Sequence, residues 1–307
     1  MIWIAAALVL VALARAAYVA ATYVIFAYES AQRGFPHFEQ SGPGWIIALR
    51  AIAGMVFEIV SSLLVLLFYP VRILMRDRGP VRAGPTGAGD LRRGATKAPR
   101  GNAGSPPCRP VLLVHGMYVN GGALLLLRRR LRRAGFLSVH LLDLDFRRGH
   151  ISTLSDQVIE RVEEIRAATG ADRVDAVGHS LGAVVVFHTL VRGGGDRLFG
   201  TCVALGAPFH GTGMASFSRS PLVRQLRPGS PVLADLRAKI DAPGALPPGA
   251  RLVSIWSNFD NVIIPAESQI LPGPDAENVR VEFLGHVSLL FSRAVANQVA
   301  RVLSGSI

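Results

Sequence analysis

Two long apolar segments lie at the start of the chain, before polar and apolar positions begin to alternate. Residues 2–27 contain a single charge, Arg15, and residues 45–69 contain two, Arg50 and Glu58. Each segment has the ~20 apolar residues that a helix needs to cross a bilayer. The pattern therefore predicts a transmembrane hairpin. A buried helix pair in a soluble protein is one alternative. A cleaved signal is another for the first segment, which lacks a preceding basic region.

Charged residues lie near the middle of both predicted helices. In an antiparallel hairpin, Arg15 and Glu58 would lie at similar depth, where a charge costs roughly 2.5–3.5 kcal/mol on insertion scales. We hypothesise that they form an ion pair inside the membrane and fix the register of the hairpin. The alternative is that each side chain faces water or another subunit.

The pattern changes after the hairpin, which we assign to residues 1–78. Residues 79–109 are rich in glycine, proline and arginine, which predicts a linker. From residue 110 onward, short apolar runs typical of buried strands alternate with segments of helical period. Strands are expected at 110–114, 137–144, 173–177, 201–205, 251–256 and 279–284, and helices at 123–134, 154–165, 181–190 and 287–303. This alternation predicts an α/β fold with a doubly wound, mostly parallel sheet over 110–307.

Composition excludes several classes of protein. Half of the residues are hydrophobic and only 18% are charged, which is too apolar for a disordered chain. Two cysteines are too few for a disulfide-stapled scaffold. No cysteine or histidine spacing predicts a metal site, and we expect no cofactor.

The formal net charge of +12 is unevenly distributed. One basic residue, Arg33, lies between the two apolar segments, whereas many follow the second one: Arg72, Arg76, Arg78, Arg82, Arg92, Arg93, Lys97, Arg100 and Arg109. The positive-inside rule places residues 72–109, and the domain after them, on the cytoplasmic side, as in a bacterial inner-membrane protein; the periplasmic face is the alternative. Because this basic segment lacks interleaved aromatic residues, it predicts contact with anionic lipid headgroups rather than nucleic acid.

A candidate nucleophile follows the third expected strand. The segment Gly178-His179-Ser180-Leu181-Gly182 opens a helix, and the order strand, sharp turn, helix is that of a nucleophile elbow. The two glycines permit the turn, and the helix N-terminus adds a positive dipole near the serine. Ser180 is the predicted nucleophile. The alternative is an ordinary glycine-rich turn.

A serine hydroxyl needs a general base, which is oriented by an acid. In this fold the chain order is serine, then aspartate or glutamate, then histidine. His286 follows the last expected strand and is the predicted base, with His210 as the runner-up. Asp260 follows the strand expected at 251–256 and is the predicted acid, with Glu267 as the runner-up.

Acyl transfer also needs donors for the oxyanion. We expect the backbone N–H groups of Leu181 and of Met117, which follows the first expected strand. A long insertion at about 207–248 has the character of a cap. Its apolar residues are interpreted either as the lining of an acyl pocket or as ordinary core, and they include Phe209, Met214, Phe217 and Leu222.

Taken together, these segments resemble bacterial lipases of the α/β-hydrolase superfamily, and also the glycosylphosphatidylinositol inositol-deacylase-like branch. The resemblance covers about residues 109–304 and rests on VHGM at 114–117, GHSLG at 178–182, GAPFHGT at 206–212, QLRPGS at 225–230 and SNFD at 257–260. It implies the same nucleophile, acid, base and oxyanion donors. The family's one or two leading strands have no candidate in 79–107, so we expect a minimal sheet that begins near residue 110.

These observations predict a membrane-anchored serine hydrolase that cleaves carboxylic esters of lipid-derived substrates. One rival is a thioesterase, amidase or acyltransferase that uses the same triad. Another is a non-catalytic membrane scaffold or lipid-binding module built on a hydrolase fold.

Overall fold

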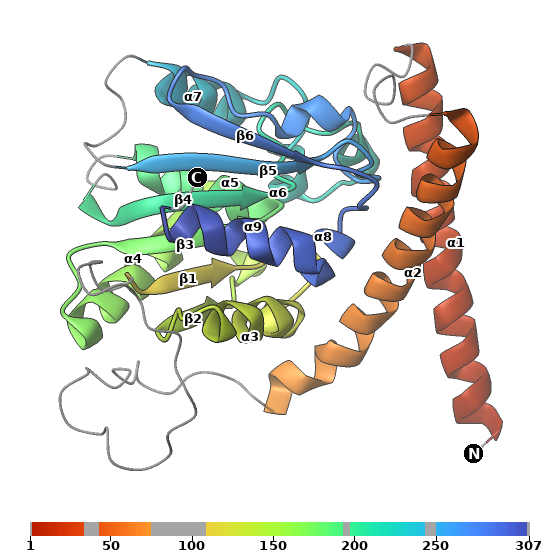
Figure 1. Cartoon of the computed structure of the whole chain (residues 1–307), viewed down its shortest axis with the longest axis horizontal. Helices are drawn as coiled ribbons and strands as arrows, with labels where there is room; N and C mark the ends of the chain where they lie inside the picture. The colour runs from red at the N-terminus through yellow and green to blue at the C-terminus, as the bar shows by residue number, and fades with distance from the viewer. Residues whose placement is uncertain (1, 34–42, 75–108, 193–196, 243–249, 306–307) are drawn as a thin grey trace.

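The computed structural model of the chain describes residues 2–33, 43–74, 109–192, 197–242 and 250–305. The linker expected at 79–109, and with it most of the basic segment, lies outside the described residues except for Arg109. The part that follows is built around one sheet, and two long helices precede it (Figure 1).

The sheet has six strands in the order β2-β1-β3-β4-β5-β6, and every neighbouring pair is parallel. This confirms the predicted α/β architecture. The strands are β1 Val111–Val114, β2 Val139–Leu142, β3 Val174–His179, β4 Phe199–Leu205, β5 Arg251–Ser257 and β6 Ala276–Val281. Successive residues of β1 face opposite sides, so Leu112 and Val114 enter one core cluster, whereas Val111 and Leu113 enter the other.

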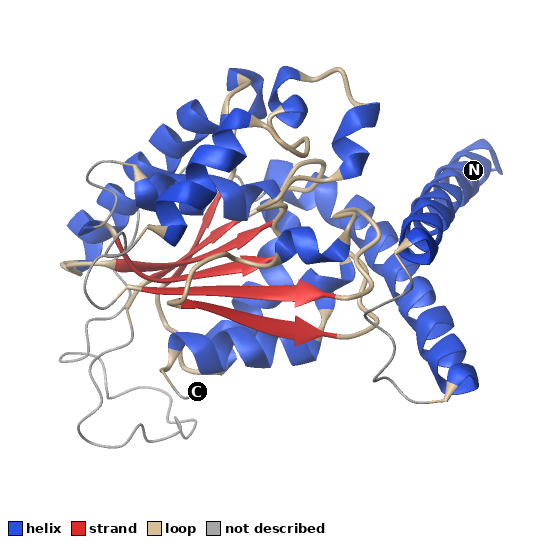
Figure 2. Cartoon of the chain, turned by 90° about the horizontal axis from the view of Figure 1, so that it is seen from above, coloured by secondary structure: helices blue, strands red, loops and turns tan. Residues whose placement is uncertain are grey.

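Helices cover both faces of the sheet (Figure 2). The helices α4 (Ile151–Thr169), α5 (Leu181–Val191) and α7 (Pro231–Asp241) pack on one face, and α3 (Leu125–Arg133) and α9 (Arg293–Leu303) pack on the other. Shorter elements complete the domain: η1 Gly121–Leu124, η2 Phe146–Arg148, η4 Gly213–Phe217, α6 Pro221–Arg224, η5 Ala266–Gln269 and α8 Ser288–Phe291. Because helices cover both faces, the inner strands between them are buried on both sides. This explains the nearly continuous apolar runs seen in the sequence.

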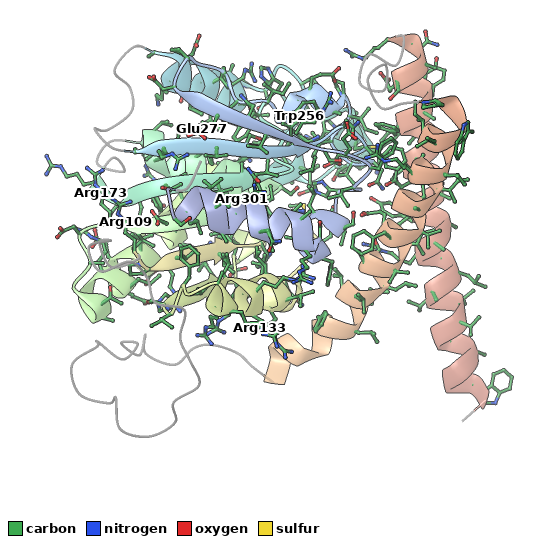
Figure 3. The ribbon with its side chains drawn as sticks, viewed as in Figure 1. Arg109, Arg133, Arg173, Trp256, Glu277 and Arg301 are labelled. Atoms are coloured by element: carbon green, nitrogen blue, oxygen red, sulfur yellow. The ribbon has the colours of Figure 1, made fainter. Side chains whose placement is uncertain are left out.

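Ion pairs link strands at one end of the sheet. Arg251 on β5 lies 2.8 Å from Glu277 on β6, and Arg109, just before β1, lies 3.5 Å from Asp175 on β3. Figure 3 labels Arg109 and Glu277 at this end of the sheet, away from the two long helices.

Two elements near the C-terminus differ from the prediction. The last strand was expected at 279–284 but ends at Val281, because Phe283 adopts a φ of 55°, which extended backbone cannot accommodate. The single closing helix expected at 287–303 is split into α8 and α9 at Ser292. The Ser292 hydroxyl accepts a hydrogen bond from Val295 N and so caps the second helix.

The two apolar segments form α1 (Ile2–Gln32) and α2 (Gly44–Leu74), each longer than predicted. By length and hydropathy, Val9–Gln32 and Gly44–Phe68 could each cross a bilayer. The strand arrowheads point towards α2 in Figure 1, so the helix pair lies beside the carboxyl ends of the strands. In doubly wound sheets, ligands bind at this edge.

Side chains of both helices pack on the domain. Tyr23 and Phe26 of α1 stack around Phe259, with ring centroids 4.7 and 5.4 Å from it. On α2, Arg50 lies 2.8 Å from Glu282 and its guanidinium covers the ring of Phe283 at 4.3 Å. The helix pair is therefore docked on the domain through aromatic and charged contacts.

The hypothesis of an Arg15–Glu58 ion pair is wrong for this structure. No ion pair joins the two side chains, both of which the structure describes. The Glu58 carboxylate instead accepts hydrogen bonds from Val287 N at 2.9 Å and from Ser288 N at 2.8 Å. Two backbone N–H groups at the start of α8 thus take the place expected for Arg15. Each donates a hydrogen bond to one oxygen of the Glu58 carboxylate.

Candidate active site

Ser180 lies at the sharp turn between β3 and α5, with φ 54° and ψ −125°. A positive φ is strained for a residue with a side chain, at a cost of about 1–3 kcal/mol, and such strain collects at functional sites. The flanking glycines make this turn possible. A Cβ atom on Gly178 would overlap the backbone of Ala183, and one on Gly182 would overlap the carbonyl oxygen of His115. The turn presents a mostly buried serine at the end of the sheet.

Asp260 and His286 are hydrogen-bonded to each other, with 2.9 Å between Oδ2 and Nδ1. Asp260 is completely buried, and its other oxygen accepts hydrogen bonds from Val262 N and Ile263 N at 2.9 and 2.8 Å. These two backbone donors fix the carboxylate so that its free oxygen faces the imidazole. The pair follows β5 and β6, two strands that neighbour each other in the sheet.

Opposing effects act on the pKa of His286. Burial disfavours the imidazolium and lowers this pKa, but the charge of Asp260, its hydrogen bond and the charge of Glu58 raise it. The balance places the pKa of His286 above its ordinary value of 6.5. Its environment therefore strengthens this imidazole as a proton acceptor.

The backbone of His286 is held on both sides. Its N–H donates to Asn261 Oδ1 at 3.1 Å, and its carbonyl oxygen accepts from His179 Nε2 at 3.0 Å. Burial lowers the pKa of His179 well below its usual value, so this ring stays neutral and carries its proton on Nε2. His179 was expected only as a flanking residue of the elbow. Its contact with His286, 107 positions away, has no signal in the sequence.

The helix pair supports the same loop. Asn261, which holds His286, donates from Nδ2 to Thr22 Oγ1 of α1 at 2.6 Å. Glu58 of α2 holds the next two N–H groups after His286, as described above. Both helices are thus connected to His286 indirectly: α1 through Asn261, and α2 through the two residues that follow His286. Sequence reasoning missed Thr22 and Asn261, and it placed Glu58 in the membrane interior.

A cavity of about 580 Å³ joins these residues. Ser180 and His286 both line it, together with Tyr18 of α1 and Ser62 of α2. No hydrogen bond joins Ser180 to His286, two residues that the structure describes fully, and in ligand-free enzymes this contact is often formed only with substrate. The helix pair therefore forms one wall of the cavity that contains the predicted nucleophile.

One predicted oxyanion donor lines this cavity, and the other directly follows Ser180 in the chain. Met117 lines it directly, and Leu181 is the first residue of α5 after Ser180. Within the described part of the chain, neither backbone N–H has a hydrogen-bond acceptor. His115 steadies the loop that carries Met117, because its Nδ1 lies 2.8 Å from Gly116 O and its Nε2 lies 3.2 Å from Leu144 N. Two unpaired N–H groups beside a nucleophile suit a developing negative charge.

The insertion divides into lining and core. Met214 and Phe217 line the cavity, as one interpretation expected. Phe209 and Leu222 do not, because both are buried in the main core, where Phe209 packs 5.0 Å from Phe187 of α5. The runner-up base, His210, is exposed and does not line the cavity.

Residues 111–298 match the model of a family described as the alpha/beta hydrolase family, and this span is more than half of the chain. The chain belongs to the alpha/beta hydrolase family. Such hydrolases carry their nucleophile at a strand-to-helix elbow, where Ser180 lies here.

Solved structures share the hydrolase fold at low sequence identity. Aspergillus fumigatus lipase B is 18% identical with a TM-score of 0.55, over 66% of this chain and 55% of that one. The mature Bacillus licheniformis lipase BlEst2 is 16% identical with a TM-score of 0.56, over 65% and 93% of the two chains. This hydrolase therefore spans about half the length of lipase B. At these identities the similarity shows a common fold.

Proposed function

We propose that this hydrolase is a membrane-anchored serine esterase that cleaves carboxylic esters of lipid-derived substrates. The observation that carries the proposal is a single cavity that contains both the strained Ser180 and the Asp260-paired His286. Nucleophile, base and acid occur in the chain order typical of the family.

The mechanism follows from these positions. Ser180 Oγ attacks the ester carbonyl carbon while His286 Nε2 takes its proton, and Asp260 stabilises the imidazolium. The N–H groups of Leu181 and Met117 bind the oxyanion. His286 then protonates the leaving alcohol as the tetrahedral intermediate breaks down to the acyl-enzyme. Water, deprotonated by His286, attacks the acyl carbon, and the acid leaves as Ser180 recovers its proton.

A lipid acyl chain fits the lining of the cavity better than a small polar ester does. Apolar residues make up a large part of the cavity lining: Val19, Met117, Met214, Phe217, Val223, Leu226, Val262 and Ile263. Pockets of a few hundred Å³ with mostly apolar walls bury most of the surface of an apolar ligand. The lipase-like and inositol-deacylase-like groups within the family remain the candidate subgroups.

The helix pair is the proposed membrane anchor. Exposed apolar side chains occur along both helices: Val9, Leu10, Val11, Leu13, Val24, Leu49, Ile52, Val56, Val60 and Leu67. These side chains, which the domain leaves uncovered, are the proposed lipid contacts. The basic residues of 72–109 favour the cytoplasmic side and contact with anionic headgroups, and the periplasmic side is the alternative.

Hydrolysis of p-nitrophenyl esters from C2 to C16 by the full-length protein in neutral detergent tests the function. We expect hydrolysis that increases with chain length and is lost in Ser180→Ala. Cleavage of acyl thioesters or anilides in preference to esters would favour the thioesterase or amidase alternative. Absence of turnover on all three substrate classes would favour the non-catalytic alternative.

Topology needs a separate measurement. A single cysteine introduced into 79–107 should be protected from impermeant thiol reagents in intact cells and become reactive after lysis. Labelling in intact cells would overturn the cytoplasmic assignment.

A further inference from the structure

The catalytic cavity contains two cationic side chains that the proposed mechanism does not use. Arg15 lines it from α1, and the exposed Arg219 lines it from the segment between η4 and α6. The two residues are 204 positions apart in the chain. They line the same cavity because α1 is docked on the domain. Any role assigned to these arginines must explain why two positive charges line the cavity in which we propose ester cleavage.

Neither guanidinium has an ion-pair partner in the part of the chain that the structure describes. Arg15 is half-buried, and its buried Nε has no hydrogen-bond partner there. The Arg15 guanidinium lies 5.3 Å from the ring of Tyr18, which offers a cation–π contact but no acceptor. A buried charged donor without an acceptor is costly, so a bound anion would supply what the protein lacks.

The carboxylate that lines the cavity does not neutralise these arginines. Glu58 Oε1 and Oε2 are occupied by Val287 N and Ser288 N. Asp260 lies behind His286 and is fully buried. The cavity lining therefore includes two unpaired cationic side chains in addition to the apolar residues named above.

We propose that Arg15 and Arg219 form an anion subsite that binds the phosphate of a glycerophospholipid whose acyl ester is cleaved at Ser180. Guanidinium groups bind phosphate oxygens through paired N–H donors. The apolar walls accept an acyl chain of the same molecule. This inference rests on the proposed ester hydrolysis and narrows its substrate to phosphate-bearing lipids.

Binding can be tested without turnover. Full-length Ser180→Ala protein in neutral detergent is titrated with dialkylglycerol phosphate, an ether lipid without a cleavable ester, and with the matching neutral dialkylglycerol, using native mass spectrometry. We expect the phosphate-bearing lipid to bind more tightly. Arg15→Gln and Arg219→Gln should each reduce this preference about 10- to 100-fold, as expected for a lost charge-assisted hydrogen bond. Arg132→Gln, an exposed arginine on α3, is the matched control and should keep the preference.

Turnover gives the second readout. The ratio of kcat/KM for phosphatidic acid to that for diacylglycerol with the same chains should fall in Arg15→Gln and in Arg219→Gln but not in Arg132→Gln. An unchanged ratio, or an equal affinity for the two ether lipids, would overturn the subsite. Tighter binding of an S-alkyl coenzyme A than of the ether phospholipid would overturn the lipid source of the phosphate. Preferential binding of the ether phospholipid without hydrolysis of any ester would contradict the proposed function and leave the subsite standing.

Discussion

The domain and the helix pair bury their polar groups in different ways. In the domain, apolar strands are covered on both faces, and the buried Asp260 carboxylate is paired internally with His286. In the helix pair, many apolar side chains are exposed, whereas three charged side chains contact the domain or line the cavity. Arg50 meets Glu282, Glu58 meets the start of α8, and Arg15 enters the cavity.

We interpret this difference as two separate tasks of the apolar helices. Charged side chains such as Arg15 and Glu58 would destabilise a helix that served only as a lipid anchor, because a charge inside the bilayer is costly. Here those charges face the domain, where they find backbone donors or line the site. We therefore interpret the helix pair as a wall of the active site as well as an anchor.

The largest expected effect lies entirely within the domain. Ser180→Ala should lower kcat for ester hydrolysis by a factor on the order of 10⁶, because it removes the nucleophile. Initial rates with a p-nitrophenyl ester measure this loss. Ser152→Ala, at an exposed serine on α4, should retain the wild-type rate. A Ser180→Ala protein with appreciable activity would move the chemistry to another residue.

Asp260→Asn should lower kcat by about 10⁴, because an asparagine stabilises neither the imidazolium nor the required tautomer of His286. The wild-type pKa of His286 is raised, so kcat/KM should fall as pH drops through a value above 6.5, where the base becomes protonated. In the Asp260→Asn protein that acidic limb should move to lower pH. A limb at the same pH in both proteins would contradict the pairing of these two residues.

Glu58→Gln tests whether α2 acts on the site. The change removes a charge and one of two acceptors for the N–H groups of Val287 and Ser288, so kcat should fall about tenfold or more. Because the charge of Glu58 also raises the pKa of His286, the acidic limb should move to lower pH. Glu29→Gln, near the end of α1, should change neither quantity. An unaltered rate and pH profile in Glu58→Gln would reduce α2 to an anchor.

The smallest expected effect concerns the exposed apolar side chains of the helix pair. Val56→Ser and Val60→Ser each remove a partly exposed apolar side chain from α2, so each should weaken partition into lipid vesicles about fivefold. Vesicle flotation measures the partition, and rates in detergent micelles should stay near wild type. Unchanged partition would show that these side chains contact something other than lipid.

Much of the fold could be predicted because it depends on local patterns. Short apolar runs located all six strands, and the glycines around Ser180 located the elbow. The chain order then selected Asp260 and His286. The strands and the elbow are short-range signals in the sequence. The positions of the acid and the base follow from the chain order that is typical of the family.

The contacts between the helix pair and the domain could not be predicted in the same way. The hydrogen bond from Asn261 to Thr22 joins residues 239 positions apart, and it depends on how α1 docks. Uniformly apolar segments show no periodic stripe that marks a docking face. For the same reason, Glu58 was paired with Arg15 by depth in a bilayer, whereas its real partners lie in the domain.

The most direct measurement is covalent labelling of the full-length protein with a fluorophosphonate, followed by peptide mapping. The reagent phosphonylates an activated serine, and we predict a single adduct on Ser180, absent in Ser180→Ala and strongly slowed in Asp260→Asn. Absence of an adduct from the folded wild-type protein, or an adduct on a different residue, would contradict the assignment of Ser180, His286 and Asp260 as the catalytic unit.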